Sequence, residues 1–165
     1  MAIDKSGASS ADPGTLGVRP RGLVKDGLLA DYDHEIGATR RMLERVPDDK
    51  LGWKPHERSM TLGELSTHLG SIPSWASAIL NENGFDLTDN PPPPRAKTTR
   101  ADILAFFDDS TRRTRAWMDL TDAQYAAPWS LKRDGHELFS VPRVAAFRTF
   151  VIHHLIHHRG QLSVY

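Results

Sequence analysis

The sequence has no cysteine, no excess of charge of either sign and no long apolar run. The lack of cysteine excludes disulfides, thiolate metal ligands and a cysteine nucleophile, so a metal site must use histidine, carboxylate or water. The 21 Lys and Arg residues equal the 21 Asp and Glu residues, whereas proteins that bind nucleic acid usually carry a basic excess on one face. No apolar run approaches the ~20 residues of a membrane span, and the first residues lack the apolar core of a signal peptide. We therefore expect no nucleic-acid partner, no membrane association and a cytoplasmic location.

Length and composition predict one domain that follows a tail. A chain of 165 residues can bury most of its apolar surface in a single core. Residues 1–20 are rich in Gly, Ser, Ala, Asp and Pro and have little to bury, which predicts a flexible N-terminal tail. Residues 21–165 are then expected to form the folded domain.

The spacing of apolar residues predicts four long helices. Apolar side chains recur at three- and four-residue steps, as on one face of a helix, over residues 25–46, 61–82, 99–120 and 142–165. The last of these has no stop signal, so we expect it to reach Tyr165 and the natural chain to continue further. Four amphipathic helices in one domain predict an all-α fold, a four-helix bundle.

Prolines and glycines mark the breaks between these helices. Pro73 lies inside the second helix, where it removes an amide hydrogen bond and should bend the helix just after His68. Pro91–Pro94 predict a stiff connector between helices that need not be antiparallel neighbours. Asp134-Gly135, within residues 129–139, lies between short apolar stretches and predicts a small hairpin before the last helix.

The last predicted helix carries four histidines, in the segment FVIHHLIHHRGQ. Side chains four residues apart lie on one helix face, with Cβ atoms about 5–6 Å apart, so either spaced pair can reach one ion. At about 100° per residue, His154 and His158 fall within the apolar face, whereas His153 and His157 fall toward its far side. Only an inward pair can meet ligands from other helices. We therefore predict that His154 and His158 form the functional pair.

His68 is predicted to join this pair, because it shares the apolar face of the second helix. A single inward histidine is more often a hydrogen-bonded core residue than a ligand. Two inward imidazoles at ligand spacing need partners for four ring nitrogens, however, and one ion satisfies two of them. Three histidines without a fourth protein ligand leave one position open, which is typical of catalytic zinc sites. We predict that His68, His154 and His158 bind one divalent metal ion.

Other polar residues are candidates for the edge of this site. Gln161, one turn beyond His158, is placed to orient a ligand or a water molecule. His34 and Glu64 are possible additional members, although a surface role for the first and a helix-cap role for the second, opposite Thr61, are favoured. Sites made only of imidazole suit zinc, nickel, copper or iron.

Two motifs resemble those of the DinB family of damage-inducible and YfiT-like bundles. One runs from LGWKP at residues 51–55 to MTLGELSTHL at residues 60–69, and the other is HLIHHRGQLSVY at residues 154–165. The resemblance covers about residues 25–165. It implies a four-helix bundle with up-down-down-up connectivity, a divalent metal ion, most often zinc or nickel, and a homodimer. The family's ligand on the second helix maps onto His68, and its spaced pair maps onto His154 and His158.

The resemblance favours a divalent-metal-dependent enzyme that acts on a small-molecule substrate. Some relatives transfer low-molecular-weight thiols such as bacillithiol or mycothiol, which implies a thiol S-transferase. The thiol would be a cofactor, since the chain has no cysteine. A metal-dependent hydrolase would use the same residues with water, and a stress-associated metal-binding module would have no catalytic role. No general base other than the histidines is identifiable, so the sequence leaves all three functions open.

Overall fold

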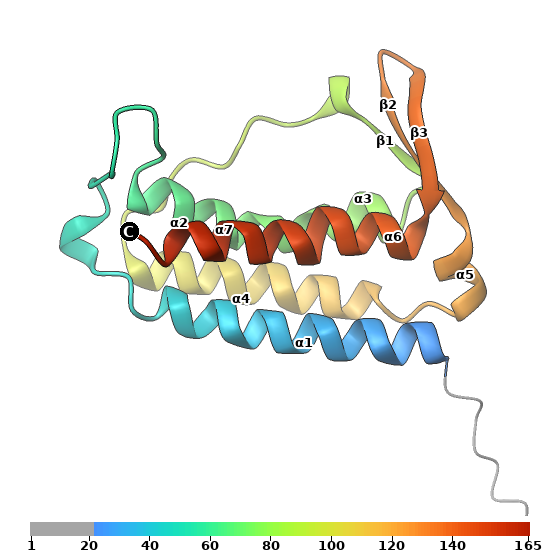
Figure 1. Cartoon of the computed structure of the whole chain (residues 1–165), viewed down its shortest axis with the longest axis horizontal. Helices are drawn as coiled ribbons and strands as arrows, with labels where there is room; N and C mark the ends of the chain where they lie inside the picture. The colour runs from blue at the N-terminus through green and yellow to red at the C-terminus, as the bar shows by residue number, and fades with distance from the viewer. Residues whose placement is uncertain (1–21) are drawn as a thin grey trace, which may run out of the picture.

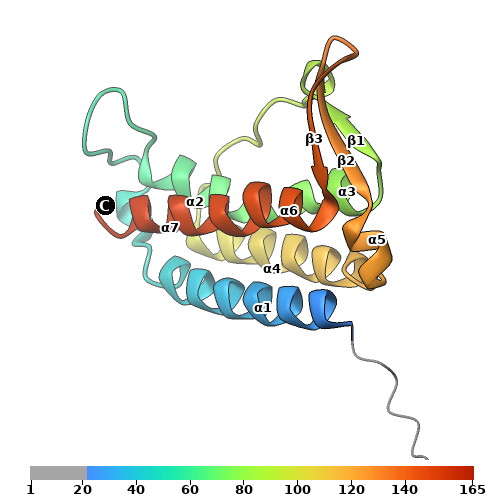
Figure 2. The ribbon, with the colours of Figure 1, turned by 45° about the vertical axis from the view of Figure 1, so that its right-hand side comes forward.

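Four helical segments lie side by side in the computed structural model, which describes residues 22–165 (Figure 1). The predicted tail over residues 1–20 lies outside this part of the chain. The central helices are α1 (Leu23–Leu43), α2 (Leu62–Ser71), α4 (Arg100–Trp117) and α7 (His154–Leu162). Helices α1 and α2 each contact both α4 and α7, so the four helices enclose one core. In Figures 1 and 2, α1 and α7 run in one direction and α2 and α4 in the other.

The second helical segment is interrupted where Pro73 predicts a bend. Helix α2 ends at Ser71, a 3₁₀ turn (η2) spans Ile72–Trp75, and α3 spans Ala76–Leu80. The carbonyl of Pro73 accepts a buried hydrogen bond of 2.6 Å from the hydroxyl of Thr114 on α4. This bond fixes the bend against the neighbouring helix, close behind His68.

The last helical segment is less regular than its sequence predicts. It begins with α6 (Arg143–Phe147), widens into a π-helical turn over Arg148–His153 (η4) and continues as α7. Such turns often occur at functional sites, and this one directly precedes His154. The helix ends at Leu162 and not at the expected Tyr165, because Tyr165 donates a hydrogen bond of 2.9 Å to the carbonyl of Met60 and turns toward the opposite segment.

A small sheet stands at one end of the bundle (Figure 1). Strands β2 (Pro128–Arg133) and β3 (His136–Pro142) pair antiparallel around Asp134 and Gly135, whose φ angles are 51° and 77°. Positive φ at both positions is typical of a two-residue hairpin loop, so the predicted hairpin is confirmed. The sequence did not predict β1 (Gly84–Asp86), which pairs parallel to β2. Gly84 permits this pairing, since a Cβ there would lie 2.6 Å from the carbonyl oxygen of Ser130.

Short elements complete the connections. They are η1 (Asp48–Lys50), η3 (Leu87–Asp89) and α5 (Asp122–Ala126). The capping box predicted at the start of α2 is present: the Thr61 hydroxyl accepts from the Glu64 amide, and the Glu64 carboxylate accepts from the Thr61 amide at 2.7 Å. The segment Pro91–Pro94 is exposed and has no helix or strand, as expected for the connector between β1 and α4.

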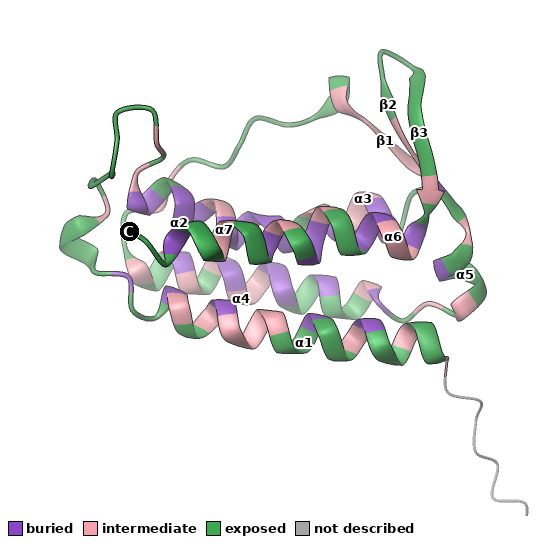
Figure 3. Cartoon of the chain, in the orientation of Figure 1, coloured by how far each residue is buried: buried purple, intermediate pink, exposed green. Residues whose placement is uncertain are grey.

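The core lies where the apolar faces of the four helical segments meet (Figure 3). Each segment contributes fully or almost fully buried side chains, among them Leu28, Tyr32, Leu65, Leu69, Phe107, Ile103, Phe147, Val151 and Leu155. Burying one such side chain contributes about 1.5–3 kcal/mol relative to leaving it in water. The fold is thus mainly helical, as predicted, with a small three-stranded sheet. Within residues 22–165 we find no helix with the length and apolar character that crossing a bilayer requires.

Candidate metal centre

The imidazole rings of His68, His154 and His158 come together between α2 and α7. One ring nitrogen from each lies within 4.8 Å of the others. The Nε2 atoms of His68 and His154 are 3.3 Å apart, and the His158 ring centroid lies 4.4 Å from that of His68 and 4.7 Å from that of His154. Among the residues that the structure describes, these three form the one group suited to holding a metal ion.

The spacing of the nitrogens fits a small cation. Metal–nitrogen bonds of about 2.0–2.1 Å in a tetrahedral site hold two nitrogens about 3.3–3.4 Å apart, which matches the 3.3 Å between His68 and His154. The same distance also fits a hydrogen bond between two neutral imidazoles. That bond would leave the His158 ring outside the pair, however, whereas one ion can be shared by all three rings.

Burial keeps these imidazoles neutral. Burial, followed by the neighbouring His158 and His154, lowers the pKa of His68 to about 4. Burial, followed by His158, also lowers the pKa of His154, against a hydrogen bond to the backbone of Phe150 that raises it. Burial lowers the pKa of His158 as well, partly offset by a hydrogen bond to Gln161. A neutral imidazole has the free lone pair that a metal ion needs, so the donor set fits a divalent cation near neutral pH.

Gln161 lies where the sequence predicts it, beside His158. Its Oε1 is 2.7 Å from Nδ1 of His158. A proton on Nδ1 donated to this amide oxygen leaves Nε2 of His158 free to face the cluster. This is how hydrogen bonds behind a metal-binding histidine usually fix its tautomer and ring orientation.

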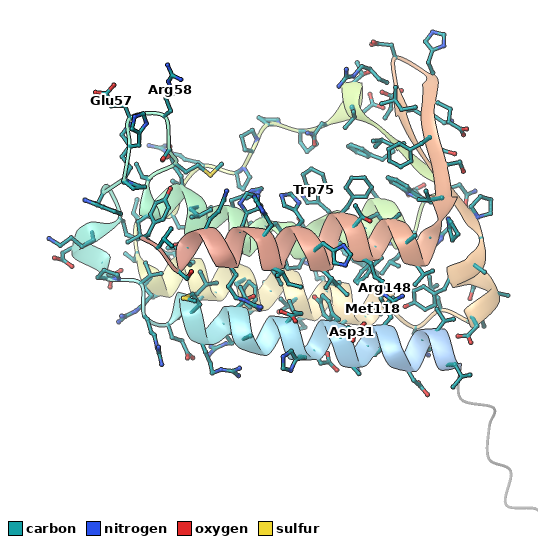
Figure 4. The ribbon with its side chains drawn as sticks, in the orientation of Figure 1. Asp31, Glu57, Arg58, Trp75, Met118 and Arg148 are labelled. Carbon is teal, nitrogen blue, oxygen red and sulfur yellow. The ribbon has the colours of Figure 1, made fainter. Side chains whose placement is uncertain are left out.

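Ion pairs with α1 set the rotation of the last helical segment. Arg159 lies next to His158 in sequence, and its Nη2 is 2.6 Å from Oε2 of Glu35, with both side chains largely buried. Its Nη1 also donates to the carbonyl of Glu35 at 3.2 Å. At the first residue of the π-helical turn, Nη2 of Arg148 lies 3.5 Å from Oδ2 of Asp31 (both residues are labelled in Figure 4). Because Arg148 and Arg159 are held toward α1, the face of the helix that carries His154 and His158 points toward α2.

Trp75 lies on one side of the cluster, and it was expected only as one apolar side chain of the second predicted helix. Its ring meets that of His154 edge-on, at 5.8 Å between centroids. The available signal was its position seven residues after His68 on the apolar face of the predicted helix, although the 3₁₀ turn over Ile72–Trp75 interrupts the helix between them. On the other side, His158 and Gln161 line a cavity of about 470 Å³ whose wall also includes Arg58.

The remaining candidate residues lie outside the cluster. His153 and His157 are exposed on the far face of the last segment, as the helical wheel predicts, and His34 is exposed on α1. The Glu64 carboxylate is held by the Thr61 amide in the capping box. None of these four residues belongs to the group that can hold an ion.

Comparison with known proteins agrees with this architecture. A family profile described as the DinB superfamily matches residues 31–162. Among solved structures, a DinB-like protein from Bacillus cereus ATCC 10987 is similar with a TM-score of 0.64 and 22% identity, covering 84% of this chain and 88% of that one. At this identity the likeness establishes the fold alone. No curated protein matches the chain.

Proposed function

Because the chain belongs to the DinB superfamily, we propose that it is a divalent-metal-dependent thiol S-transferase whose ion is held by His68, His154 and His158. One observation carries the proposal: three neutral imidazoles from two separate helices converge without a fourth protein ligand among the described residues. Structural zinc sites usually have four protein ligands, whereas catalytic sites have three and leave a position open. Among the metals that suit all-imidazole sites, zinc and nickel are the ions we expect.

When bound, a divalent ion would lower the pKa of a thiol or water molecule at the open position and would so supply a nucleophile near neutral pH. The protein's own residues prepare the site. Burial keeps the His68 ring neutral, Gln161 orients the His158 ring, and Trp75 covers His154 from one side. The cavity beside His158, with the cationic Arg58 on its wall, is the route by which a thiol cosubstrate enters.

Three further features belong to the same proposal. The directions of α1, α2, α4 and α7 in Figure 1 support the up-down-down-up connectivity of the family. We expect a homodimer, which size-exclusion chromatography with light scattering would detect as twice the 18.4 kDa chain mass. A cytoplasmic location, where a low-molecular-weight thiol is available, stays a prediction from the sequence.

Thiol conjugation tests the function directly. Purified zinc- or nickel-loaded protein is mixed with monochlorobimane and either bacillithiol, mycothiol or no thiol, and the fluorescent conjugate is followed. In the expected reaction the thiol sulfur forms a bond to the carbon that carries chlorine, chloride leaves, and the thiol proton passes to solvent. We expect conjugation above the uncatalysed rate only with both metal and thiol, loss in His154→Ala, and retention in the matched variant His157→Ala.

Other outcomes would contradict the transferase. Ester hydrolysis by the metal-loaded protein that needs no thiol, and that His154→Ala abolishes, would instead establish the hydrolase. If neither reaction occurs while metal binds in stoichiometric amount, the chain is a non-catalytic metal-binding module.

A further inference from the structure

A second cavity lies beside Trp75, the residue whose ring packs against His154 of the cluster. It has a volume of about 410 Å³, within the size range of small-molecule binding sites. Trp75 lines this cavity and also packs edge-on against the His154 ring. In Figure 4 the Trp75 ring stands between the helices and the segment from β1 to α4, and Asn90 and Pro91 of that segment line the same cavity. One tryptophan thus borders both the cavity and a proposed metal ligand.

The lining of this cavity is mainly aromatic and aliphatic. Its walls come from η2, α3, β1, β2, the segment between β1 and α4 and the π-helical turn, and include Trp75, Phe85, Trp129, Leu131, Phe150 and Ile79. The rings are held in place: Trp129 Nε1 donates a 2.9 Å hydrogen bond to the carbonyl of Ala78, and the Trp129 and Phe150 centroids are 5.7 Å apart. Fixed aromatic walls favour a flat apolar ligand, because such a ligand gains contact area without the wall losing side-chain freedom.

The π-helical turn connects this cavity with the cluster. Phe150 lies inside the turn, four residues before His154, and lines the cavity. A ligand that packs on the Phe150 and Trp75 rings therefore lies next to the tryptophan that contacts His154.

The charges around the cavity restrict what it can bind. Of the described residues that line it, Glu82 is the only one with an ionisable side chain, and Glu82 is exposed. Ser74, Ser77 and Asn90 supply the other polar groups. An anionic ligand would lose its hydration here without meeting a cation, which costs free energy that contacts with neutral groups do not return. The lining therefore favours an uncharged ligand.

We propose that this cavity binds the flat, uncharged aromatic part of the substrate and presents the substrate's reactive end to the histidine cluster. This assignment rests on the proposed function, since it identifies the class of electrophile that the transferase accepts. Polar thiol cosubstrate and apolar electrophile then approach the cluster from opposite sides. The thiol enters beside His158 and Arg58, and the electrophile enters beside Trp75.

A neutral fluorescent probe tests the cavity independently of catalysis. N-phenyl-1-naphthylamine is titrated into metal-free and zinc-loaded protein, and its fluorescence reports binding. We expect saturable one-to-one binding in both forms. Ala78→Phe, which places a ring in the cavity, should weaken binding by about tenfold or more. The matched variant Ala116→Phe adds the same ring to an exposed position on α4 and should bind like the wild-type protein.

The charge of the probe and the metal content separate the outcomes. We expect 2-naphthoate to bind about tenfold or more weakly than the neutral probe. Equal or tighter binding of 2-naphthoate, or unchanged probe binding in Ala78→Phe, would overturn the assignment. Zinc uptake by Ala78→Phe should equal that of the wild type, because the three histidines are untouched. If Ala78→Phe loses probe binding but takes up zinc normally, the substitution has acted on the cavity and not on the metal site. If the wild-type protein binds the probe but takes up no zinc, the proposed function is contradicted and the cavity assignment is not.

Discussion

The two faces of the last helical segment carry the same residue type at the same spacing but differ in their surroundings. His154 and His158 lie partly buried against α2, where each ring is within reach of His68. His153 and His157, one residue earlier in each pair, are exposed. Burial lowers the pKa of the inward histidines.

This comparison shows that spacing alone does not make a metal site. Either pair could chelate an ion from a single helix. Only the inward pair meets a third imidazole from another helix and a hydrogen-bond partner that fixes a ring, Gln161. A metal-binding site therefore differs from two neighbouring histidines in having a third ligand and a ligand ring whose tautomer is fixed. The predictions below test that distinction.

Removing any one of the three inward imidazole rings should have the largest effect on metal binding. We expect His68→Ala, His154→Ala and His158→Ala to lower the metal content of the purified protein from about one ion per chain to nearly none, since two ligands hold zinc far more weakly than three. Elemental analysis after dialysis measures this. His153→Ala and His157→Ala are the matched controls and should retain the full content. Equal loss in all five variants would mean that the two faces do not differ.

Removing the hydrogen-bond partner of the His158 ring should have an intermediate effect on metal affinity. Gln161→Ala removes the partner of His158 Nδ1, and loss of such a partner typically costs about 10–100-fold in metal affinity. Competition with a chromophoric chelator gives the affinity. Gln161→Glu keeps an acceptor oxygen at the same distance from the backbone and should retain most of the wild-type metal affinity. An unchanged affinity in Gln161→Ala would show that the hydrogen bond does not orient the ligand.

The buried rings should make the metal-free protein sensitive to acid. The pKa of His68 is about 4 in the folded chain, against about 6.5 in an unfolded one. Between these values the unfolded chain binds a proton that the folded chain does not, so the free energy of unfolding falls as the pH falls from about 6.5 to 4. We expect His68 to contribute a loss of about 1–3 kcal/mol, discounted for its partial exposure.

Urea denaturation at several pH values, with a chelator present, measures this dependence. His68→Ala should flatten the slope between pH 6.5 and 4, whereas the exposed control His153→Ala should leave it unchanged. If the slope were the same in His68→Ala and the wild type, the acid sensitivity would have to arise elsewhere.

The outward histidines should give the smallest effect on stability. His153 and His157 are exposed, and substitutions at such positions usually change the free energy of unfolding by no more than about 0.5 kcal/mol. Chemical denaturation of His153→Ala and His157→Ala at pH 7.5 would check this. A destabilisation of several kcal/mol would show that the outer face has partners of its own.

Much of the fold was predictable because it depends on local rules. The Thr61–Glu64 capping box, the bend at Pro73 and the turn at Asp134-Gly135 each follow from the chemistry of a few neighbouring residues. The inward placement of His154 and His158 follows from helix periodicity. The apolar residues around them show which face is buried.

The features that sequence reasoning missed depend on distant contacts. The π-helical turn before His154 has no local signal, and neither does β1, whose pairing requires Gly84 to lie against Ser130. Arg159 reads as a surface cation until α1 brings Glu35 to it. A helical wheel predicts only that Trp75 lies on the apolar face of its helix. It cannot show that other segments of the chain form a cavity beside this side chain.

An anomalous-scattering map from crystals of the metal-loaded protein, recorded at the absorption edge of the ion, tests the central claim most directly. We expect one strong peak per chain, at bonding distance from a nitrogen of His68, His154 and His158, with none near His153 or His157. A map without a peak among those three rings, from crystals shown to contain the metal, would contradict the account.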